Sequence, residues 1–142
     1  MSEPDLPYRF DTRAVVVVRD DLAPWQELNV TAFLSTGLAA DAGLLGEPYL
    51  DADGTVYTPM LREPIMVRVA SGAELAGIRA AAVARGLRTA VYTAELFTTT
   101  HDAANRAAVA AVAGAALDLV GVAVHGPKNA VDRVTKRASL HP

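Results

Sequence analysis

The chain has 142 residues, of which 51% are apolar and 20% charged, and this composition fits one globular domain with a sizeable hydrophobic core. It contains no cysteine, which excludes disulfides and thiolate metal sites. The net charge is −3, whereas proteins that hold nucleic acid through its phosphates usually carry a basic excess, so the charge argues against a nucleic-acid partner.

Residues 1–13 are expected to form an extended leader rather than a targeting segment. The first ten residues are polar, with two prolines, and have no basic region followed by an apolar run. No apolar stretch of the chain reaches the ~18 residues that span a bilayer. Together with the lack of cysteine, this leads us to expect a cytoplasmic protein with no membrane partner.

The first regular segment is predicted to be a buried strand followed by an apolar helix. Residues 14–19 read AVVVVR, a β-branched run without alternation that favours a central strand buried on both faces. Asp20 and Asp21 come next and Pro24 follows, which together signal a helix N-terminus. The helix expected over residues 24–40 is apolar nearly all round, so it should pack on the sheet and also on another layer or a second subunit.

Residues 47–60 predict a β-hairpin. The pairs Tyr49–Leu50 and Val56–Tyr57 flank the string DADG at residues 51–54, and an Asp-Gly pair favours a tight turn. The same string matches the start of a calcium loop, but it lacks the later ligands and the closing glutamate, so the turn is favoured. A hairpin among strand–helix units also implies that the sheet is mixed.

The remaining segments alternate between strands and helices. Ser71 is expected to cap the second helix, with Glu74 in its first turn and Gly86 as its stop, and residues 98–100 are capping candidates for the third. Strands are expected at 65–69, 89–92 and 119–125, with an edge strand at 139–140, and helices at 73–85, 102–115 and 129–135. This pattern predicts a single α/β domain over residues 14–142, with a sheet covered on both faces.

Several strings along the chain resemble known families. AVVVVRDDL at 14–22 and VGVAVHGPKNAVDRVTKRASL at 120–140 resemble the peptidyl-tRNA hydrolase II superfamily. PWQELNVTAFL, GEPYLDADG, PMLREPI, YTAELFTTTHDAANR and HGPKNAVDRVTK, which run the length of the chain, are similar to the domain of unknown function 2000 family. The resemblance implies a three-layer α/β/α fold of the peptidyl-tRNA hydrolase II type, and a homodimer.

The chain departs from that superfamily where a tRNA ester would be cleaved. Peptidyl-tRNA hydrolases of this type carry a Gly-Lys-Gly-Lys stretch and a downstream glutamine at the first helix, whereas residues 23–28 here read APWQEL, without lysine. Their Asp-Ala-Gly-x-Thr loop is replaced by YTAELFTTTH at 92–101. The superfamily's catalytic residues therefore do not carry over, while the scaffold and the place of a site do.

The turns that follow the strands are the expected site, because ligands of open α/β sheets bind beyond the carboxyl ends of the strands. Three segments are expected to meet there, residues 20–29, 92–105 and 125–129. Helical spacing puts Trp25 and Asn29 on one face. Asn29 is an amide on an otherwise apolar surface, so it either caps a backbone group or faces a ligand, and Trp25 is either core or a ligand platform.

His101 and Asn105 are expected to share the buried face of the following helix with Val109 and Val112. A histidine titrates near neutral pH and can act as acid, base or ligand, the alternative being one bonded to a backbone carbonyl at a helix start. His101 and Asp21 are the predicted catalytic residues. The residues predicted to contact a ligand are Trp25, Gln26, Asn29, Tyr92, Thr93, Thr100, Asn105 and Lys128.

Other kinds of site have weaker support. His101, His125 and an aspartate such as Asp21 could give a metal two nitrogens and a carboxylate, but no spacing supports this set. There is no Gly-x-Ser-x-Gly elbow for a nucleophilic serine. Residues 126–129 (GPKN) could hold an anion through backbone amides and Lys128, although a turn into a helix is the simpler interpretation. We therefore expect no metal and no cofactor.

Three functions remain open from the sequence, and whether the protein is an enzyme is one of the open points. The first is binding of a small molecule, or hydrolysis of an acyl or amide compound with His101 as general base. The second is hydrolysis of peptidyl- or aminoacyl-tRNA esters, against which the missing lysines and the acidic balance argue. The third is a non-catalytic dimeric interaction module whose first helix forms the interface.

Overall fold

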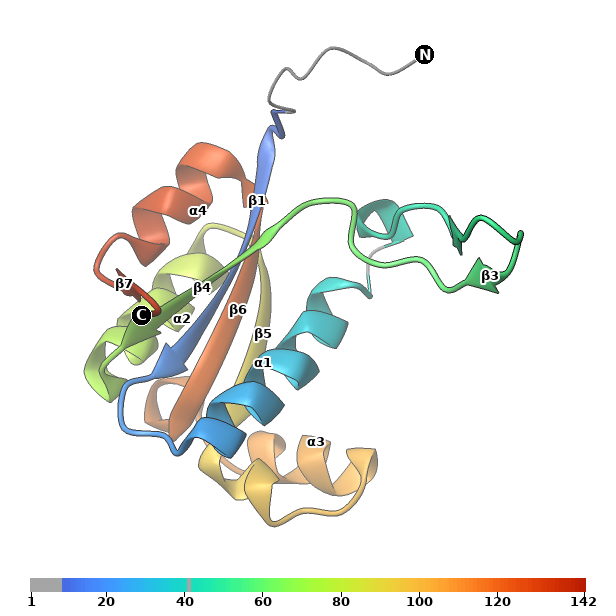
Figure 1. Cartoon of the computed structure of the whole chain (residues 1–142). Helices are drawn as coiled ribbons and strands as arrows, with labels where there is room; N and C mark the ends of the chain where they lie inside the picture. Colours follow the sequence, from blue (N-terminus) through green and yellow to red (C-terminus); the bar gives the residue numbers. More distant parts are fainter. Residues whose placement is uncertain (1–8, 41) are drawn as a thin grey trace.

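A five-stranded mixed sheet forms the centre of the molecule, in a computed structural model that describes residues 9–40 and 42–142 (Figure 1). The strand order is β5-β6-β1-β4-β7. The strands are β1 (Thr12–Arg19), β4 (Ile65–Ala70), β5 (Arg88–Thr93), β6 (Leu119–Pro127) and β7 (Ser139–Leu140). The helices are α1 (Pro24–Leu38), α2 (Gly72–Ala84), α3 (Asp102–Ala110) and α4 (Lys128–Thr135). None of these helices is long and apolar enough to cross a membrane, within the described part of the chain.

The valines of β1 build the core on both faces of the sheet. Val15 and Val17 belong to one apolar cluster, Val16 and Val18 to the other, and all four are fully buried. This follows from the alternation of side chains along a strand. The first cluster is covered by α2 and α4 and the second by α1, so the molecule has the expected three layers.

Strand directions decide where the site can lie. β1 and β4 run parallel, and β5 runs parallel to them because both β1 and β5 pair antiparallel with β6. The end of β6 therefore lies beside the start of β1, where Pro127 pairs with Thr12. The predicted meeting of three segments is wrong in this respect: residues 20–29 and 92–105 share one end of the sheet, while residues 125–129 lie at the opposite end.

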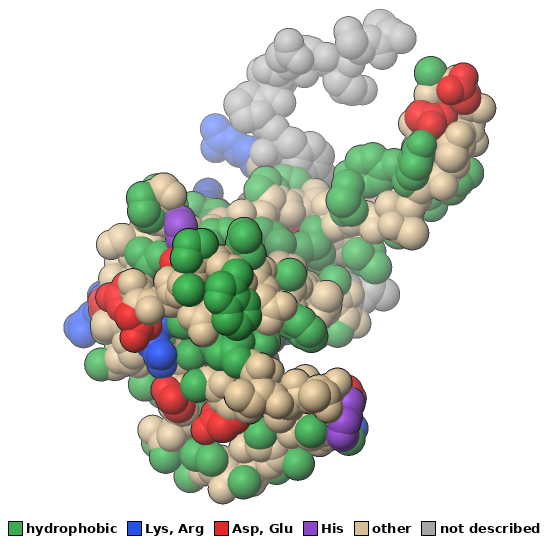
Figure 2. Space-filling view, turned by 60° about the horizontal axis from the view of Figure 1, so that its bottom comes forward, with side chains coloured by type: hydrophobic (Ala, Val, Ile, Leu, Met, Phe, Trp, Pro, Cys, Tyr) green, Lys and Arg blue, Asp and Glu red, His purple; other side chains and the backbone are tan. Residues whose placement is uncertain are grey.

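Residues 45–61 form an arm that projects from the body (Figures 1 and 2). The arm contains β2 (Tyr49–Leu50) and β3 (Val56–Tyr57), which pair antiparallel as expected, and Gly54 takes a positive φ of 82° in the turn. These two strands form a sheet of their own. The main sheet is thus mixed, as predicted, but because β6 and β7 run antiparallel to their neighbours and not because of the hairpin.

Two ends of elements differ from the sequence prediction. β1 begins at Thr12 rather than residue 14, because Thr12 and Arg13 continue the ladder with β6. Residues 1–8 of the predicted leader lie outside the described residues. α3 ends at Ala110 rather than near residue 115, and a 3-10 turn, Gly114–Ala116, follows. No residue of α3 is buried, so little packing supports a longer helix there.

Candidate functional site

A cleft of about 540 Å³ separates α1 from α3 at the carboxyl ends of β1 and β5. It appears in Figure 2 as an indentation between the body of the molecule and the lobe that carries α3. The residues that line it are Trp25, Asn29, Phe33, Thr36, Tyr92, Leu96, Phe97, Thr99, Thr100, His101, Asp102 and Asn105. The cleft thus brings together six of the predicted site residues, namely Trp25, Asn29, Tyr92, Thr100, His101 and Asn105.

Aromatic rings form one wall of the cleft. Phe97, in the 3-10 turn after β5, packs edge-on against Trp25 with ring centroids 5.6 Å apart, and its ring is tilted against Tyr92 with centroids 5.2 Å apart. Tyr92 also makes an edge contact with Phe33 of α1 at 6.0 Å. Because α1 and β5 are both fixed on the sheet, these contacts hold a preformed apolar surface. Trp25 and Phe33 remain more than half exposed.

Asn29 and Tyr92 connect the two elements at the base of this wall. The Asn29 side-chain amide donates a hydrogen bond to the Tyr92 hydroxyl at 3.0 Å. Burial raises the pKa of Tyr92 above its ordinary value, and the hydrogen bond from Asn29 partly offsets this, so the phenol stays protonated at neutral pH. The Asn29 side-chain oxygen accepts no hydrogen bond from the described residues. It can therefore accept one from a ligand.

His101 is the N-cap of α3, at the helix start that the second sequence interpretation expected, but its partner is a backbone N–H and not a carbonyl. Its Nδ1 accepts a hydrogen bond from the backbone N–H of Ala104 at 3.2 Å. An accepting Nδ1 carries no proton, so in the neutral ring the proton lies on Nε2. The His101 side chain is exposed, and the expectation that it would lie on a buried helix face is wrong. The geometry therefore presents an N–H donor at the cleft.

The threonines before α3 bond to the turn that carries them and do not cap the helix. Thr98 and Thr99 donate hydrogen bonds to the backbone carbonyls of Glu95 and Leu96. The Thr99 hydroxyl also lies in hydrogen-bond contact with the Asn105 side-chain oxygen. No contact among the described residues uses the Asn105 amide nitrogen. This contact with Thr99 therefore holds the side chain with that nitrogen available to a ligand.

Two of the predicted residues near the start of α1 do not line the cleft. Asp21 forms an ion pair with Arg19 at 2.6 Å, and this hydrogen bond lowers the pKa of the Asp21 carboxyl below its usual range. A carboxylate held ionised in this way is a poor proton donor at neutral pH. The Gln26 side-chain oxygen accepts from the backbone N–H of Ala23 at 2.9 Å and so closes the first turn of α1.

Thr93 and Lys128 also lie outside the cleft. Thr93 is 1% exposed, and its hydroxyl has no hydrogen-bond partner among the described residues. Lys128 lies at the other end of the sheet, where its backbone N–H bonds to Asp11, and it lines a separate hollow of about 260 Å³. The antiparallel course of β6 explains this separation, and the sequence carried no signal for that direction.

The sequence did not predict a buried polar cluster around Glu63. Glu63 is 6% exposed, and its two carboxylate oxygens accept hydrogen bonds from the Thr12 hydroxyl at 2.6 Å and from His125 Nε2 at 2.8 Å. Both oxygens are thus satisfied by protein groups, which favours a structural role in tying the root of the arm to the sheet. A glutamate directly before a proline and a strand was the available signal, and spacing alone could not pair it with His125.

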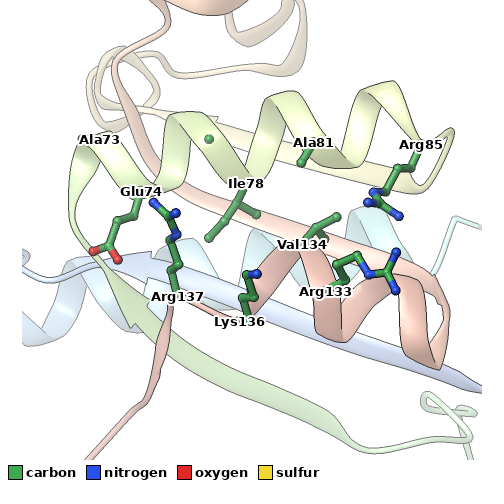
Figure 3. Close-up of a pocket in the computed structure, with 10 residues that line it drawn as sticks. Ala73, Glu74, Ile78, Ala81, Arg85, Arg133, Val134, Lys136 and Arg137 are labelled. Carbon is green, nitrogen blue, oxygen red and sulfur yellow. The ribbon is translucent and has the colours of Figure 1, made fainter.

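A second groove lies between α2 and α4 and has a basic rim (Figure 3). Its volume is about 340 Å³, and Ile78, Ala81 and Val134 form its floor. Arg85 and Arg133 lie at one end of the groove, and Arg137 faces Glu74 at the other. Arg85 caps the C-terminus of α2, and Arg133 lies in the last turn of α4. Cations at helix C-termini stabilise the helix dipole, which accounts for them without a ligand.

The two hollows differ in the chemistry they offer. The α1–α3 cleft combines four aromatic rings with uncharged hydrogen-bonding groups, and its one charged lining residue, Asp102, is paired with Arg106. No lysine or arginine lines it among the described residues. The residues that the structure describes contain no group of three or more His, Asp or Glu side chains placed to hold a metal. The cleft thus suits a flat, uncharged organic molecule.

Comparisons with known proteins identify the family and a solved structure with a similar fold. The family model described as "Protein of unknown function (DUF2000)" matches residues 12–142. A solved structure, that of the protein of unknown function Atu0240 from Agrobacterium tumefaciens strain C58, is similar over 94% of this chain and 100% of its own. The sequence identity is 41% and the TM-score 0.89. A search of curated proteins gives no match.

Proposed function

Since this chain belongs to the DUF2000 family, described as proteins of unknown function, we propose its function from the cleft itself: it binds a small, flat acyl or amide compound between α1 and α3. The observation that carries this proposal is the convergence of an aromatic wall and uncharged donors on one hollow. Such a hollow, largely apolar with a few fixed polar groups, is typical of small-molecule sites.

The polar groups of the cleft suit a carbonyl compound. The Nε2–H of His101 and the free amide hydrogens of Asn105 can donate to a carbonyl oxygen, and the Asn29 oxygen can accept from an amide N–H. The aromatic wall of Trp25 and Phe97 provides the surface on which a flat group can stack.

For hydrolysis, this geometry favours a donor role for His101 over the general-base role expected from the sequence. A base needs an unprotonated nitrogen, and Nδ1 is already used by the Ala104 N–H. Donation from Nε2 would instead stabilise negative charge on a carbonyl oxygen attacked by water. Hydrolysis of an acyl or amide compound is therefore a second step of the proposal, beyond binding. The lack of cations in the cleft does not favour a tRNA ester.

We also propose that the fold belongs to the peptidyl-tRNA hydrolase II superfamily. This assignment rests on the sequence strings at residues 14–22 and 120–140, and on the order of strands and helices between them. Superposition of this fold on a solved member of that superfamily tests it. We expect β1, α1 and β6 to superpose with the same directions and order. A different order of strands would remove the assignment and leave the cleft unchanged.

Fluorescence of Trp25 gives a direct test of binding. Trp25 is the sole tryptophan of the chain and lines the cleft, so a ligand there should change its emission saturably. We would titrate the protein with benzamide and a panel of small aromatic amides and esters. His101→Asn should weaken binding roughly tenfold, because asparagine still caps the helix but loses the Nε2–H donor.

The control variant is His141→Asn, since His141 bonds to Glu27 and does not line the cleft. It should bind as the parent protein does. A panel in which no compound changes Trp25 emission saturably would overturn the proposed function. If His101→Asn and the parent protein bind the compound with equal affinity, His101 is not part of the ligand site. Release of acid or amine from a bound compound, lost in His101→Asn, would show that the site also hydrolyses.

A further inference from the structure

Exposed apolar side chains are concentrated on α1 and the arm. Of the eleven large apolar side chains exposed among the described residues, nine lie on these two elements, with exposed fractions from 39% to 74%. They are Trp25, Leu28 and Phe33 on α1, and Leu45, Tyr49, Leu50, Val56, Tyr57 and Met60 on the arm. Scattered single residues of this kind are ordinary on a surface, but a concentration marks an interaction site.

Within the described part of the chain, β2 and β3 of the arm pack mainly on each other and leave their side chains exposed. Two backbone hydrogen bonds close the base of the ribbon, from Gly46 N–H to the Met60 carbonyl and from Arg62 N–H to the Leu44 carbonyl. An isolated two-stranded hairpin is marginally stable in water. Both faces of this ribbon are exposed, with the Tyr49–Tyr57 pair and the Leu50–Val56 pair on opposite sides. Among the residues that the structure describes, this ribbon is therefore left without a cover.

The root of the arm is nevertheless fixed to the sheet. Glu63 lies two residues after the arm, and its bonds to Thr12 and His125 hold this point against β1 and β6. The charges of the arm are confined to Glu47, Asp51 and Asp53, which leaves the residues of β2 and β3 uncharged. The acidic tip is visible at the far end of the arm in Figure 2. The arm is thus an apolar element that is anchored at one end and aimed away from its own domain.

We propose that a second copy of this chain covers both surfaces, with the arm of each copy packed on the α1 face of the other. Such an exchange is reciprocal, so one patch serves both subunits, as two-fold symmetry requires. Nine side chains exposed to this extent present on the order of 900 Å² of apolar surface, at roughly 150–250 Å² for a whole large side chain. A standard stable interface removes about 800 Å² from each partner, so the available area is sufficient.

The exchange has a consequence for the cleft, and this part rests on the proposed function. Trp25 and Phe33 belong both to the exposed face of α1 and to the lining of the cleft. Whatever packs on that face therefore lies at the mouth of the cleft. The partner's arm becomes part of the site's entrance and shields a bound ligand from water. The site is then complete only in the dimer.

Light scattering of the full chain tests the oligomeric state. We expect a mass twice that of the 14.9 kDa chain at micromolar concentration. Leu28→Glu on α1 and Leu50→Glu on the arm should each give a monomer, because each buries a charge in the interface. Val83→Glu is the matched control, since Val83 is 54% exposed on α2 and should leave the dimer intact. A parent protein that is monomeric at high micromolar concentration would overturn the proposal.

Cysteine cross-linking tests the exchange itself, because the native chain has no cysteine. Tagged Leu28→Cys protein is mixed with untagged Leu50→Cys protein and oxidised. The exchange predicts a disulfide between the two different variants, and none when Val83→Cys replaces Leu50→Cys. Cross-links of Leu28→Cys only with itself would contradict the arm exchange, because they would mean that two α1 helices face each other.

The two proposals can fail separately. Cross-linking and light scattering need no ligand, so they report on the dimer alone. If the dimer forms as described, Leu50→Glu should weaken benzamide binding measured by Trp25 fluorescence, although Leu50 does not line the cleft of its own chain. A monomeric Leu50→Glu protein that binds benzamide as the parent does would keep the proposed function and remove the arm from the site.

Discussion

Two polar side chains, Glu63 and His101, differ in burial and in how fully their hydrogen-bonding groups are used. Glu63 is the one charged side chain that is buried among the described residues, and both of its carboxylate oxygens are bonded. His101, by contrast, is exposed and uses one ring nitrogen to cap α3. The fully satisfied group belongs to the framework, whereas the group with a free donor belongs to the cleft. This contrast separates Glu63, a structural residue, from His101, which we propose to contact a ligand.

Removal of the Glu63 carboxylate tests its structural role. Glu63→Ala should lower the free energy of unfolding by about 3 kcal/mol, because the Thr12 hydroxyl and the His125 ring would lose a charged acceptor. Urea denaturation of the parent and the variant measures this difference. The control is Glu95→Ala, since Glu95 is exposed in the turn after β5. Equal losses in the two variants would mean that the buried cluster adds no stability.

At the scale of elements, α1 sits close to the sheet because β6 has a glycine beneath it. A Cβ on Gly121 would lie 2.5 Å from Val30 Cγ1 and 2.9 Å from Leu34 Cδ1, closer than carbon atoms approach. Val30 and Leu34 are both fully or nearly fully buried. The close contact places Asn29 and Phe33 beside Tyr92, so it also sets the base of the cleft.

Gly121→Ala should therefore push α1 away from β6. We expect a loss of about 1–3 kcal/mol in the free energy of unfolding, the usual cost of overpacking. Gly77→Ala is the control, because Gly77 lies in α2 with open space around its Cβ position, and alanine favours a helix. Thermal unfolding of both variants compares them. A Gly121→Ala protein as stable as Gly77→Ala would show that the contact relaxes without cost.

Much of the order of elements could be predicted from the sequence, and the direction of β6 could not. The valine run at 15–18, the cap at Ser71 and the Asp-Gly turn at 53–54 are local signals, and local structure follows them. Strand direction depends on contacts between distant segments, which one sequence does not contain. Trp25, Asn29 and His101 follow strands that run in the same direction, and they line one cleft as predicted. Lys128 follows β6, which runs in the opposite direction, so its predicted place was at the wrong end of the sheet.

The extent of α3 depended on burial in the same way. Its alanine-rich sequence predicted a helix to residue 115, with His101 on a buried face, but the segment packs mainly on the turn after β5 and not on the sheet. Without a buried face, the helix ends early and the histidine caps it. The cleft exists because α3 stands away from α1, and periodicity alone could not show that separation.

For the whole molecule, the three layers account for stability, and the two elements outside them account for the proposed interactions. α3 forms one side of the cleft, and the arm provides the proposed exchange between copies. Both elements expose most of their side chains, whereas the sheet and its covering helices hold the core. A binding function in this fold is therefore expected at α3 and the arm.

If the α1–α3 cleft binds the ligand, amide spectra recorded during a benzamide titration should locate the ligand there. In ¹H–¹⁵N NMR spectra of isotope-labelled protein, we predict saturable shifts concentrated at residues 25–36 and 92–105, with little change at residues 73–85 and 133–137. Shifts centred on the groove between α2 and α4 would overturn the proposed site, and so would spectra unchanged by every compound of the panel.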